Sequence, residues 1–182
     1  MGWQKMKFAY ADPPYLGLAK KFYGNLHPDA ADYDKKEKHI ELVERLMDEF
    51  PDGWALSLHA PSLPFYATII PKKARICAWT KTVHQLWWDK AVQYGWEPVI
   101  LYGGRKEHFR RPMVRDWMSC PRAQRKGLRG SKPDKFNDWI LDLLNYKPED
   151  EVVDLFPGTN GMAAAVERRL IIERDRLRPN LD

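Results

Sequence analysis

An aspartate, two prolines and a tyrosine, Asp12 to Tyr15, directly follow a short apolar run. Because a proline ring fixes φ, the pair leaves the Pro13 carbonyl few conformations and holds both flanking side chains beside it. The exocyclic amine of a nucleic-acid base is a poor nucleophile, since its lone pair is delocalised into the ring. A carboxylate and a carbonyl, each accepting one of its N–H groups, would localise that pair toward a methyl sulfonium, and Tyr15 could stack on a base swung out of the duplex. The alternative is a plain proline-rich turn.

A glycine-bearing turn at residues 157–161 follows the apolar run 151–156 and precedes an alanine-rich segment. Such a turn lets a ligand approach the backbone and meet the N-terminus of the following helix. The turn has neither the Gly-Lys-Ser/Thr of a phosphate-binding loop nor a full G-x-G-x-x-G pattern. Taken alone, it is also compatible with an ordinary strand-to-helix connection.

Short apolar runs alternate with segments of helical periodicity along the chain. Strands are expected at residues 7–11, 54–59, 75–79, 98–102 and 151–156. One helix is expected from Asp34, where Glu37 completes a capping-box pattern, and another from Pro133. Strands that alternate with helices predict an α/β fold with a mostly parallel sheet flanked by helices.

The composition fits a single globular domain over residues 1–182. Hydrophobic residues make up 44% of the chain, enough for a sizeable core, and 30 Lys and Arg exceed 25 Asp and Glu for a formal charge of +5. Two cysteines occur, and no His, Cys and acidic residues stand at metal-ligand spacing, so no metal site is expected. No stretch approaches the ~20 apolar residues of a membrane span, and no leader sequence is visible, so we expect a cytoplasmic protein without membrane contact.

Residues 103–131 form a basic segment without helical or strand periodicity. Residues 105–132 contain ten Lys or Arg and only two acidic residues. We expect a long loop or insertion whose charge favours contacts with nucleic-acid phosphates, the alternative being a merely solvated loop. The residues expected to bind nucleic acid are Arg105, Arg110, Arg111, Arg115, Arg125, Lys126 and Arg129.

Four elements of the chain, taken in order, resemble the amino-methyltransferases that act on adenine N6 or cytosine N4. In the subgroup whose catalytic loop comes first, a DPPY loop precedes a target-recognition region, a Lys-Pro pair before a helix, and a D-x-F-x-G loop. Here these are residues 12–15, the basic segment, Lys132-Pro133, and residues 154–158. The small stand-alone DNA methylases of bacteria and their phages are especially similar, since they often read DPPY-L-G, as residues 12–17 do here.

The resemblance implies a Rossmann-like, S-adenosyl-L-methionine-dependent methyltransferase that methylates a flipped base in DNA, with adenine N6 as the target. It implies a cytoplasmic enzyme of a bacterium or a phage-infected cell, with a role in restriction-modification. The catalytic residues would be Asp12, Pro13, Pro14 and Tyr15. The cofactor ligands would be Lys132, Pro133, Asp154, Phe156, Gly158, Thr159, Asn160 and Glu173.

Two positions depart from the family pattern. The cofactor loop usually has a second glycine two residues after the first, where Asn160 stands here with Gly161 after it. Asparagine tolerates positive φ, so the turn is expected to survive. The apolar run 170–172 with Glu173 resembles the next strand and its acidic ribose ligand, but the edge strand that usually follows is missing. We therefore expect a shortened C-terminal end.

Other functions stay open from the sequence alone. Cytosine N4 methylation is usually associated with Ser at the first motif position, and RNA adenine methylation is a further alternative. A catalytically weak DNA-binding module is favoured by Asn160 and the short C-terminal end. The oligomeric state is open, a homodimer included. His59 and Lys81 stand at strand ends near the expected site, but structural roles are favoured for both.

Overall fold

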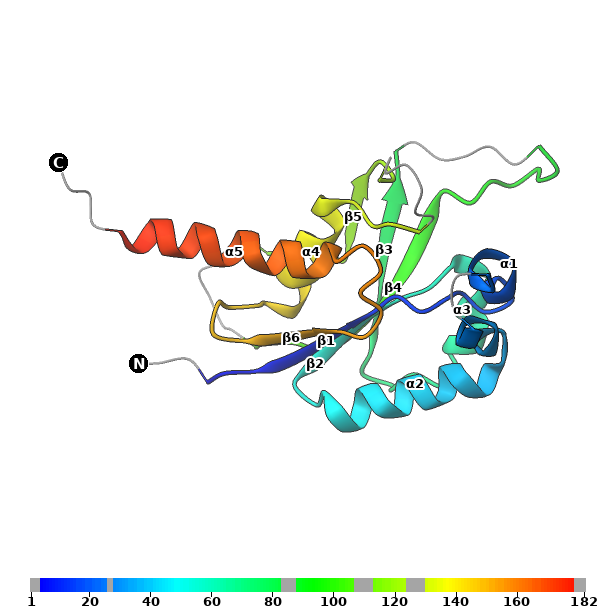
Figure 1. Cartoon of the computed structure of the whole chain (residues 1–182), viewed down its shortest axis with the longest axis horizontal. Coiled ribbons are helices and arrows are strands. Elements are labelled where there is room, and N and C mark those ends of the chain that lie inside the picture. Colours follow the sequence, from blue (N-terminus) through cyan, green and yellow to red (C-terminus); the bar gives the residue numbers. More distant parts are fainter. Residues whose placement is uncertain (1–3, 26–27, 83–87, 107–112, 124–129, 179–182) are drawn as a thin grey trace.

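A six-stranded sheet with helices on both faces forms the core of the computed structural model, which describes residues 4–25, 28–82, 88–106, 113–123 and 130–178 (Figure 1). The strands are β1 (Lys7–Ala11), β2 (Gly53–Ser57), β3 (Arg75–Lys81), β4 (Trp96–Gly103), β5 (Trp117–Cys120) and β6 (Glu151–Asp154). The helices are α1 (Ala19–Tyr23), α2 (Lys36–Glu49), α3 (Leu63–Tyr66), α4 (Asp134–Leu144) and α5 (Gly161–Leu177), with 3-10 helices at Pro28–Asp34 and Ala60–Ser62. The predicted α/β class is confirmed.

The strand order is β5-β3-β4-β2-β1-β6, and most neighbours run parallel. β1 is parallel to β2 and β6, and β3 is parallel to β5. β4 is antiparallel to both β2 and β3, a reversal that the alternation of apolar runs did not reveal. A mostly parallel sheet needs cover on both faces, and β1, which lies between β2 and the edge strand β6, is buried from its second residue onward.

Two apolar clusters cover the two faces of the sheet. On one face, Phe8 and Tyr10 pack with Phe136 of α4 and Met162 of α5. On the other face, alternate residues of the same strands pack with α2 and α3, where Leu46 is fully buried. Figure 1 shows α2 and α3 on one side of the sheet and α4 and α5 on the other. The site at the end of β1 is therefore held from both sides.

A buried ion pair joins the starts of β1 and β6. The Asp150 carboxylate is fully buried, accepts the backbone N–H groups of Met6 (2.9 Å) and Lys147 (2.8 Å), and pairs with Arg105. The Arg105 side chain is only 7% exposed. The prediction that Arg105 binds nucleic acid is therefore wrong, because its guanidinium is committed to the interior.

The predicted capping box at Asp34 is also wrong. The Asp34 carboxylate instead accepts the backbone N–H groups of Ala19 (2.8 Å) and Lys20 (3.0 Å) at the start of α1. α2 begins at Lys36, after an N-cap Lys35 that makes no side-chain cap. The same acidic residue thus stabilises a helix N-terminus, but that of a neighbour in space.

Two further elements differ from the sequence-based expectation. The basic segment contains β5, a short edge strand that pairs with β3, so the loop prediction is wrong for Trp117–Cys120. The apolar run 170–172 lies within α5, which continues to Leu177 (Figure 1). The predicted strand ending at Glu173 is therefore wrong, and β6 is an edge of the sheet.

Within the described ranges, none of the helices has the length and apolar character needed to span a bilayer.

The buried pair of Arg105 and Asp150 gives a test of the fold. Asp150→Ala should lower the free energy of unfolding by about 3 to 5 kcal/mol, because it removes the buried carboxylate that accepts from the Arg105 guanidinium and from two backbone N–H groups. The measurement is urea denaturation at neutral pH. Asp32→Ala, which breaks an exposed pair with Lys35, is the control and should leave the midpoint almost unchanged. Equal effects of the two changes would contradict the structural role of Asp150.

Candidate active site

The two loops singled out in the sequence lie side by side at one edge of the sheet. β1 and β6 pair in parallel, with Tyr10 opposite Asp154, and the Leu155 N–H donates to the Tyr10 carbonyl at 2.9 Å. Since the carboxyl ends of parallel neighbours meet at the same edge, residues 12–15 emerge next to residues 155–160. This is where open α/β sheets bind their ligands.

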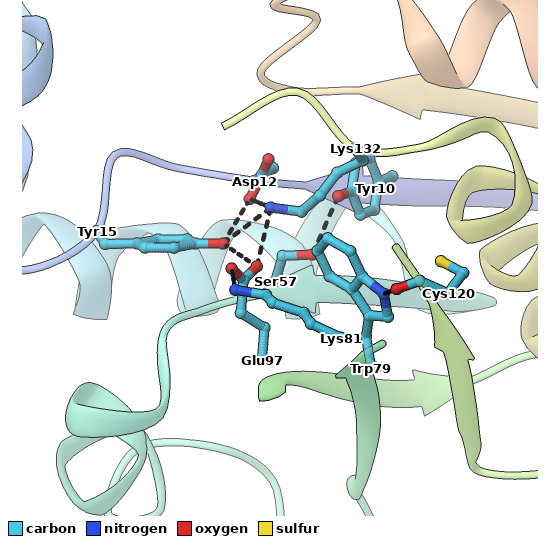
Figure 2. Close-up of polar contacts among 9 residues, drawn as sticks. All are labelled: Tyr10, Asp12, Tyr15, Ser57, Trp79, Lys81, Glu97, Cys120 and Lys132. Carbon is cyan, nitrogen blue, oxygen red and sulfur yellow. Dashed lines mark hydrogen bonds and ion pairs between the residues drawn. The ribbon is translucent and has the colours of Figure 1, made fainter. Parts of the chain in front are cut away.

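A cluster of buried charges surrounds Asp12 (Figure 2). The Lys132 ammonium donates to Asp12 Oδ1 at 2.9 Å and to the Tyr15 hydroxyl oxygen at 2.8 Å, and lies 3.4 Å from Glu97 Oε2. Glu97 in turn pairs with Lys81. The Tyr15 hydroxyl lies 2.9 Å from Glu97 Oε2 and 3.3 Å from Asp12 Oδ1. Two carboxylates and two ammonium groups thus form one connected network, called here the charge cluster.

The charge cluster is mostly shielded from solvent. Exposed side-chain fractions are 7% for Lys132, 8% for Lys81, 15% for Glu97 and 20% for Asp12. Burial raises the pKa of Asp12, although Lys132 acts to lower it. Burial also acts to raise the pKa of Glu97, but Lys132 and Lys81 outweigh it and bring that pKa to about 2. Asp12 is therefore the more basic of the two carboxylates.

The Tyr15 ring is fixed at its edge and on one face. Its hydroxyl lies within the charge cluster, and its pKa is raised well above the ordinary value by burial and by Asp12 and Glu97. His59 stacks on the ring at a centroid distance of 5.3 Å and an interplanar angle of 9°. The His59 Nδ1 is hydrogen-bonded to Ser62 Oγ at 2.9 Å, so the imidazole is held in turn. His59 thus has the structural role expected, but its contact is with the candidate catalytic tyrosine.

Pro13 and Pro14 connect the two ends of this loop. Pro13 is buried and Pro14 is half-buried. Among the described residues, none of the loop or side-chain hydrogen bonds ends on the Pro13 carbonyl. In the chain, this carbonyl directly follows the residue that carries the Asp12 carboxylate.

Below the charge cluster, the side chains are apolar or hydrogen-bonded. The Tyr10 hydroxyl and Ser57 Oγ are 3.0 Å apart and buried (Figure 2). Trp79 packs against Phe136 at a centroid distance of 5.0 Å and donates its indole N–H to the Cys120 carbonyl at 3.2 Å. These buried side chains exclude water from beneath the charge cluster.

The second loop has the backbone conformation that its sequence demands. Gly158 has a φ of +46°, and Asn160 has a φ of +57° in the left-handed region. The expectation that Asn160 can take the place of the usual glycine in this turn is confirmed. Asp154 accepts the Phe156 N–H at 3.1 Å, while burial raises its pKa to about 6. The Asp154 side chain thus holds the backbone just before the turn.

The N-terminus of α5 can receive an acidic group. The helix has no side-chain cap and no acidic residue in its first turn. Next to it, the Asn137 side-chain amide is buried, and its Nδ2 has no hydrogen-bond partner among the described residues. A Cβ at Gly161 would lie 2.6 Å from that nitrogen, so any larger residue there would have to displace the Asn137 amide. A helix N-terminus with an unpartnered donor beside it suits a carboxylate or phosphate.

An open groove of about 380 Å³ runs between β6 and α5. Its walls are largely apolar, with the two acidic residues Asp154 and Glu167 among them. The lining residues are Val152, Asp154, Met162, Ala163, Val166, Glu167 and Leu170. Together with the α5 N-terminus, the groove fits a ligand that has an apolar ring portion, hydroxyl groups and a carboxylate.

The predicted cofactor residues are only partly brought together. Residues 154–160 lie together, and Ser131 Oγ is 3.5 Å from Thr159 Oγ1, which places the segment before α4 against this loop. The Lys132 ammonium, however, is directed to Asp12 and Glu97 (Figure 2). Glu173 lies on α5 and pairs with Arg176 at 3.8 Å, so its predicted position at a strand end is wrong.

Of the predicted nucleic-acid ligands besides Arg105, only Arg115 lies within the described residues. Its side chain is exposed and its guanidinium carbon lies 5.4 Å from the centroid of the Trp117 ring. Arg110, Arg111, Arg125, Lys126 and Arg129 lie outside the described residues. Their role stays a prediction.

Sequence reasoning missed Glu97 entirely. The signal was present, because Glu97 is the one charged residue in a strand that otherwise contains Trp, Pro, aliphatic residues, Tyr and Gly. A charge in such a strand needs a partner. Lys81, for which a structural role is favoured from the sequence, lies with its ammonium 5.3 Å from the centroid of the Trp79 ring and pairs with Glu97 in the charge cluster. In the part of the chain that the structure covers, no three His, Cys, Asp or Glu side chains are grouped as metal ligands.

No protein-family model matches the chain, and no curated protein sequence matches it. Among solved structures, the fold is similar to that of M1.HpyAVI in complex with SAM, with a TM-score of 0.58 over 90% of this chain and 78% of that chain, at 16% identity. A structure of M1.HpyAVI also matches with a TM-score of 0.49 over 91% and 77% of the two chains, at 16% identity. The first similarity confirms the predicted Rossmann-like fold.

The low pKa of Glu97 predicts an acid dependence of stability. A carboxyl whose pKa falls from an ordinary 4.5 to about 2 on folding contributes stability that is complete above pH 4.5 and lost as the pH falls toward 2. Glu97→Gln removes this contribution, on the order of 3 kcal/mol at neutral pH. The two unfolding free energies, measured by denaturant titration at several pH values, should therefore converge below pH 4.5. A constant difference down to pH 2 would contradict this account of Glu97.

Proposed function

We propose that this chain is an S-adenosylmethionine-dependent methyltransferase that acts on the exocyclic amino group of a flipped base in DNA, with adenine N6 as the target. The observation that carries the proposal is the position of the Asp12 carboxylate, the Pro13 carbonyl and the Tyr15 ring beside the loop of residues 154–160. The first loop suits an amine and the second suits a cofactor with a carboxylate and an adenosine.

Three groups of the first loop would act on the target amine. The Asp12 carboxylate and the Pro13 carbonyl would each accept one of its N–H groups. This would localise the lone pair on the nitrogen and direct it out of the plane of the base, toward the methyl group. The raised pKa of Asp12 makes this carboxylate a better acceptor for the proton that the amine must lose. Tyr15, with His59 on one face, would offer its other face to the flipped base.

The second loop and α5 would hold the cofactor. The α5 N-terminus and the Asn137 amide would receive its carboxylate, and the groove between β6 and α5 would take its adenosine. When bound, the cofactor supplies a methyl group on a positively charged sulfur. The protein contributes alignment and a dry surrounding, which can lower the barrier by several kcal/mol. M1.HpyAVI has a similar fold, and its matching structure is a complex with SAM, which supports this choice of cofactor.

DNA is the proposed substrate because of the basic segment. The exposed Arg115 guanidinium lies over the Trp117 ring near the edge of the sheet. This arrangement is suited to contact with a phosphate or a base. Asp12 at the first motif position favours adenine N6, whereas the cytosine N4 enzymes that the chain resembles usually carry Ser there. The experiment must therefore also be able to detect methylation of cytosine N4 and methylation of RNA alone.

The test of function is transfer of a methyl group in vitro, with Asp12→Ala as the diagnostic variant. Purified protein is incubated with isotopically labelled S-adenosylmethionine and DNA or RNA, and nucleosides are separated by mass spectrometry. We expect labelled N6-methyldeoxyadenosine from the wild type. For Asp12→Ala we expect retained fold and cofactor binding within about tenfold, or ~1.4 kcal/mol, but a kcat lower by orders of magnitude with a smaller change in KM. A near wild-type rate for Asp12→Ala would overturn the catalytic assignment.

The groove gives a second test, with a matched control on the same helix. Glu167 lines the groove and Glu173 does not. Glu167→Ala should weaken binding of S-adenosylhomocysteine by about 1 to 2 kcal/mol, because it removes a charged acceptor that would be available to the ribose hydroxyls. Glu173→Ala should leave the affinity unchanged. Isothermal titration calorimetry measures both, and a loss confined to Glu173→Ala would show that the adenosine does not lie in this groove.

A further inference from the structure

Lys132 has two carboxylates within reach. Its ammonium is 2.9 Å from Asp12 Oδ1 and 3.4 Å from Glu97 Oε2, and it donates to the Tyr15 hydroxyl at 2.8 Å between them (Figure 2). The Lys132 side chain is only 7% exposed, so solvent cannot take the place of a lost partner. The ammonium is thus shared rather than committed.

The pair between Lys132 and Asp12 opposes the proposed chemistry. A target amine must displace the ammonium from the carboxylate before it can donate to Asp12. If Asp12 were the sole counter-charge, this displacement would leave a buried ammonium unpaired, which is strongly unfavourable. The site therefore needs a second carboxylate close enough to keep Lys132 neutralised.

We infer that Glu97 is a positioning residue that takes over Lys132 when the target amine occupies Asp12. The inference rests on the proposed function. Since Lys132 already lies close to Glu97, the exchange needs only a small movement of the ammonium. Asp12 then faces the amine free of a competing cation, and Glu97 acts through Lys132 without touching the substrate.

Lys81 completes the arrangement. It pairs with Glu97 on the side away from Asp12, and with it the charge cluster contains two positive and two negative groups. Because the incoming amine is neutral, this balance is unchanged when Lys132 moves from one carboxylate to the other. Both ammonium groups also keep Glu97 ionised, which the exchange requires.

The titratable groups that face this cluster come from every element around it. They are Tyr10 of β1, Asp12 and Tyr15 after β1, Tyr23 of α1, His59 after β2, Lys81 of β3, Glu97 of β4, Lys132 before α4 and Asp154 of β6. For Asp12, burial acts to raise the pKa, Lys132 acts to lower it and Glu97 acts to raise it. Loss of the Glu97 charge should therefore lower the pKa of Asp12.

The experiment compares Glu97→Gln in two backgrounds. In the wild-type chain, Glu97→Gln should reduce kcat at least tenfold with little change in KM for DNA, because Lys132 can no longer leave Asp12. In the Lys132→Met background, the same exchange should change kcat less than twofold, since the competing ammonium is gone. If Glu97 instead acts only by holding Tyr15, the loss should be as large in both backgrounds, and the inference fails.

A second readout needs neither cofactor nor DNA. The Asp12 carboxyl can be titrated by carbon-13 NMR in the free protein, where Glu97→Gln should lower its pKa. An unchanged or raised pKa would overturn the inference. S-adenosylhomocysteine affinity should stay within about twofold in Glu97→Gln, and the same exchange at exposed Glu41 should leave kcat and the Asp12 titration unchanged.

The outcomes separate this inference from the proposed function. If the wild type transfers no methyl group to any nucleic acid, the proposed function fails and the inference with it. If the wild type methylates DNA and Glu97→Gln keeps its kcat, only the inference fails. Where Glu97→Gln proves too unstable to assay, a large loss of kcat in the double variant relative to Lys132→Met alone still overturns the inference.

Discussion

The parallel pairing of β1 with β6 is the constraint on which the site depends. Its register sets Tyr10 opposite Asp154 and so places residue 12 level with the start of the glycine-bearing turn. A shift of one residue would send every side chain of one strand to the other face of the sheet. Burial on both faces of β1 and the pair of Arg105 with Asp150 at its start resist such a shift. The proposed chemistry requires both loops at this edge of the sheet.

Much of this arrangement could be predicted from the sequence. The apolar runs before Asp12 and after Glu151 identify β1 and β6, and two prolines or a glycine end each run. The motifs mark the ends of strands, and strand ends meet at one edge of a parallel sheet. Asn160 was expected to accept positive φ, and it does. These features are local, so short stretches of sequence are sufficient to reveal them.

What could not be predicted depends on contacts between distant segments. Asp34 and Glu37 have the spacing of a capping box, yet the Asp34 carboxylate accepts backbone N–H groups of α1 instead. The run at 170–172 suits a strand or a helix equally, and the continuing helical register of α5 decides it. Glu97 gives no hint of its partners, because Lys81 and Lys132 reach it from other elements.

The charge cluster has a consequence for how the chain folds. Asp12 and Lys132 are 120 positions apart, and the other two members come from β3 and β4. Contacts of such sequence separation form late, after the loops between them have closed. Until then each charge is better left in water than buried alone, and apolar side chains of similar size would give a more stable interior. Burial of the four charges must therefore wait until all of these segments have met, so this corner of the molecule should stay hydrated until late in folding.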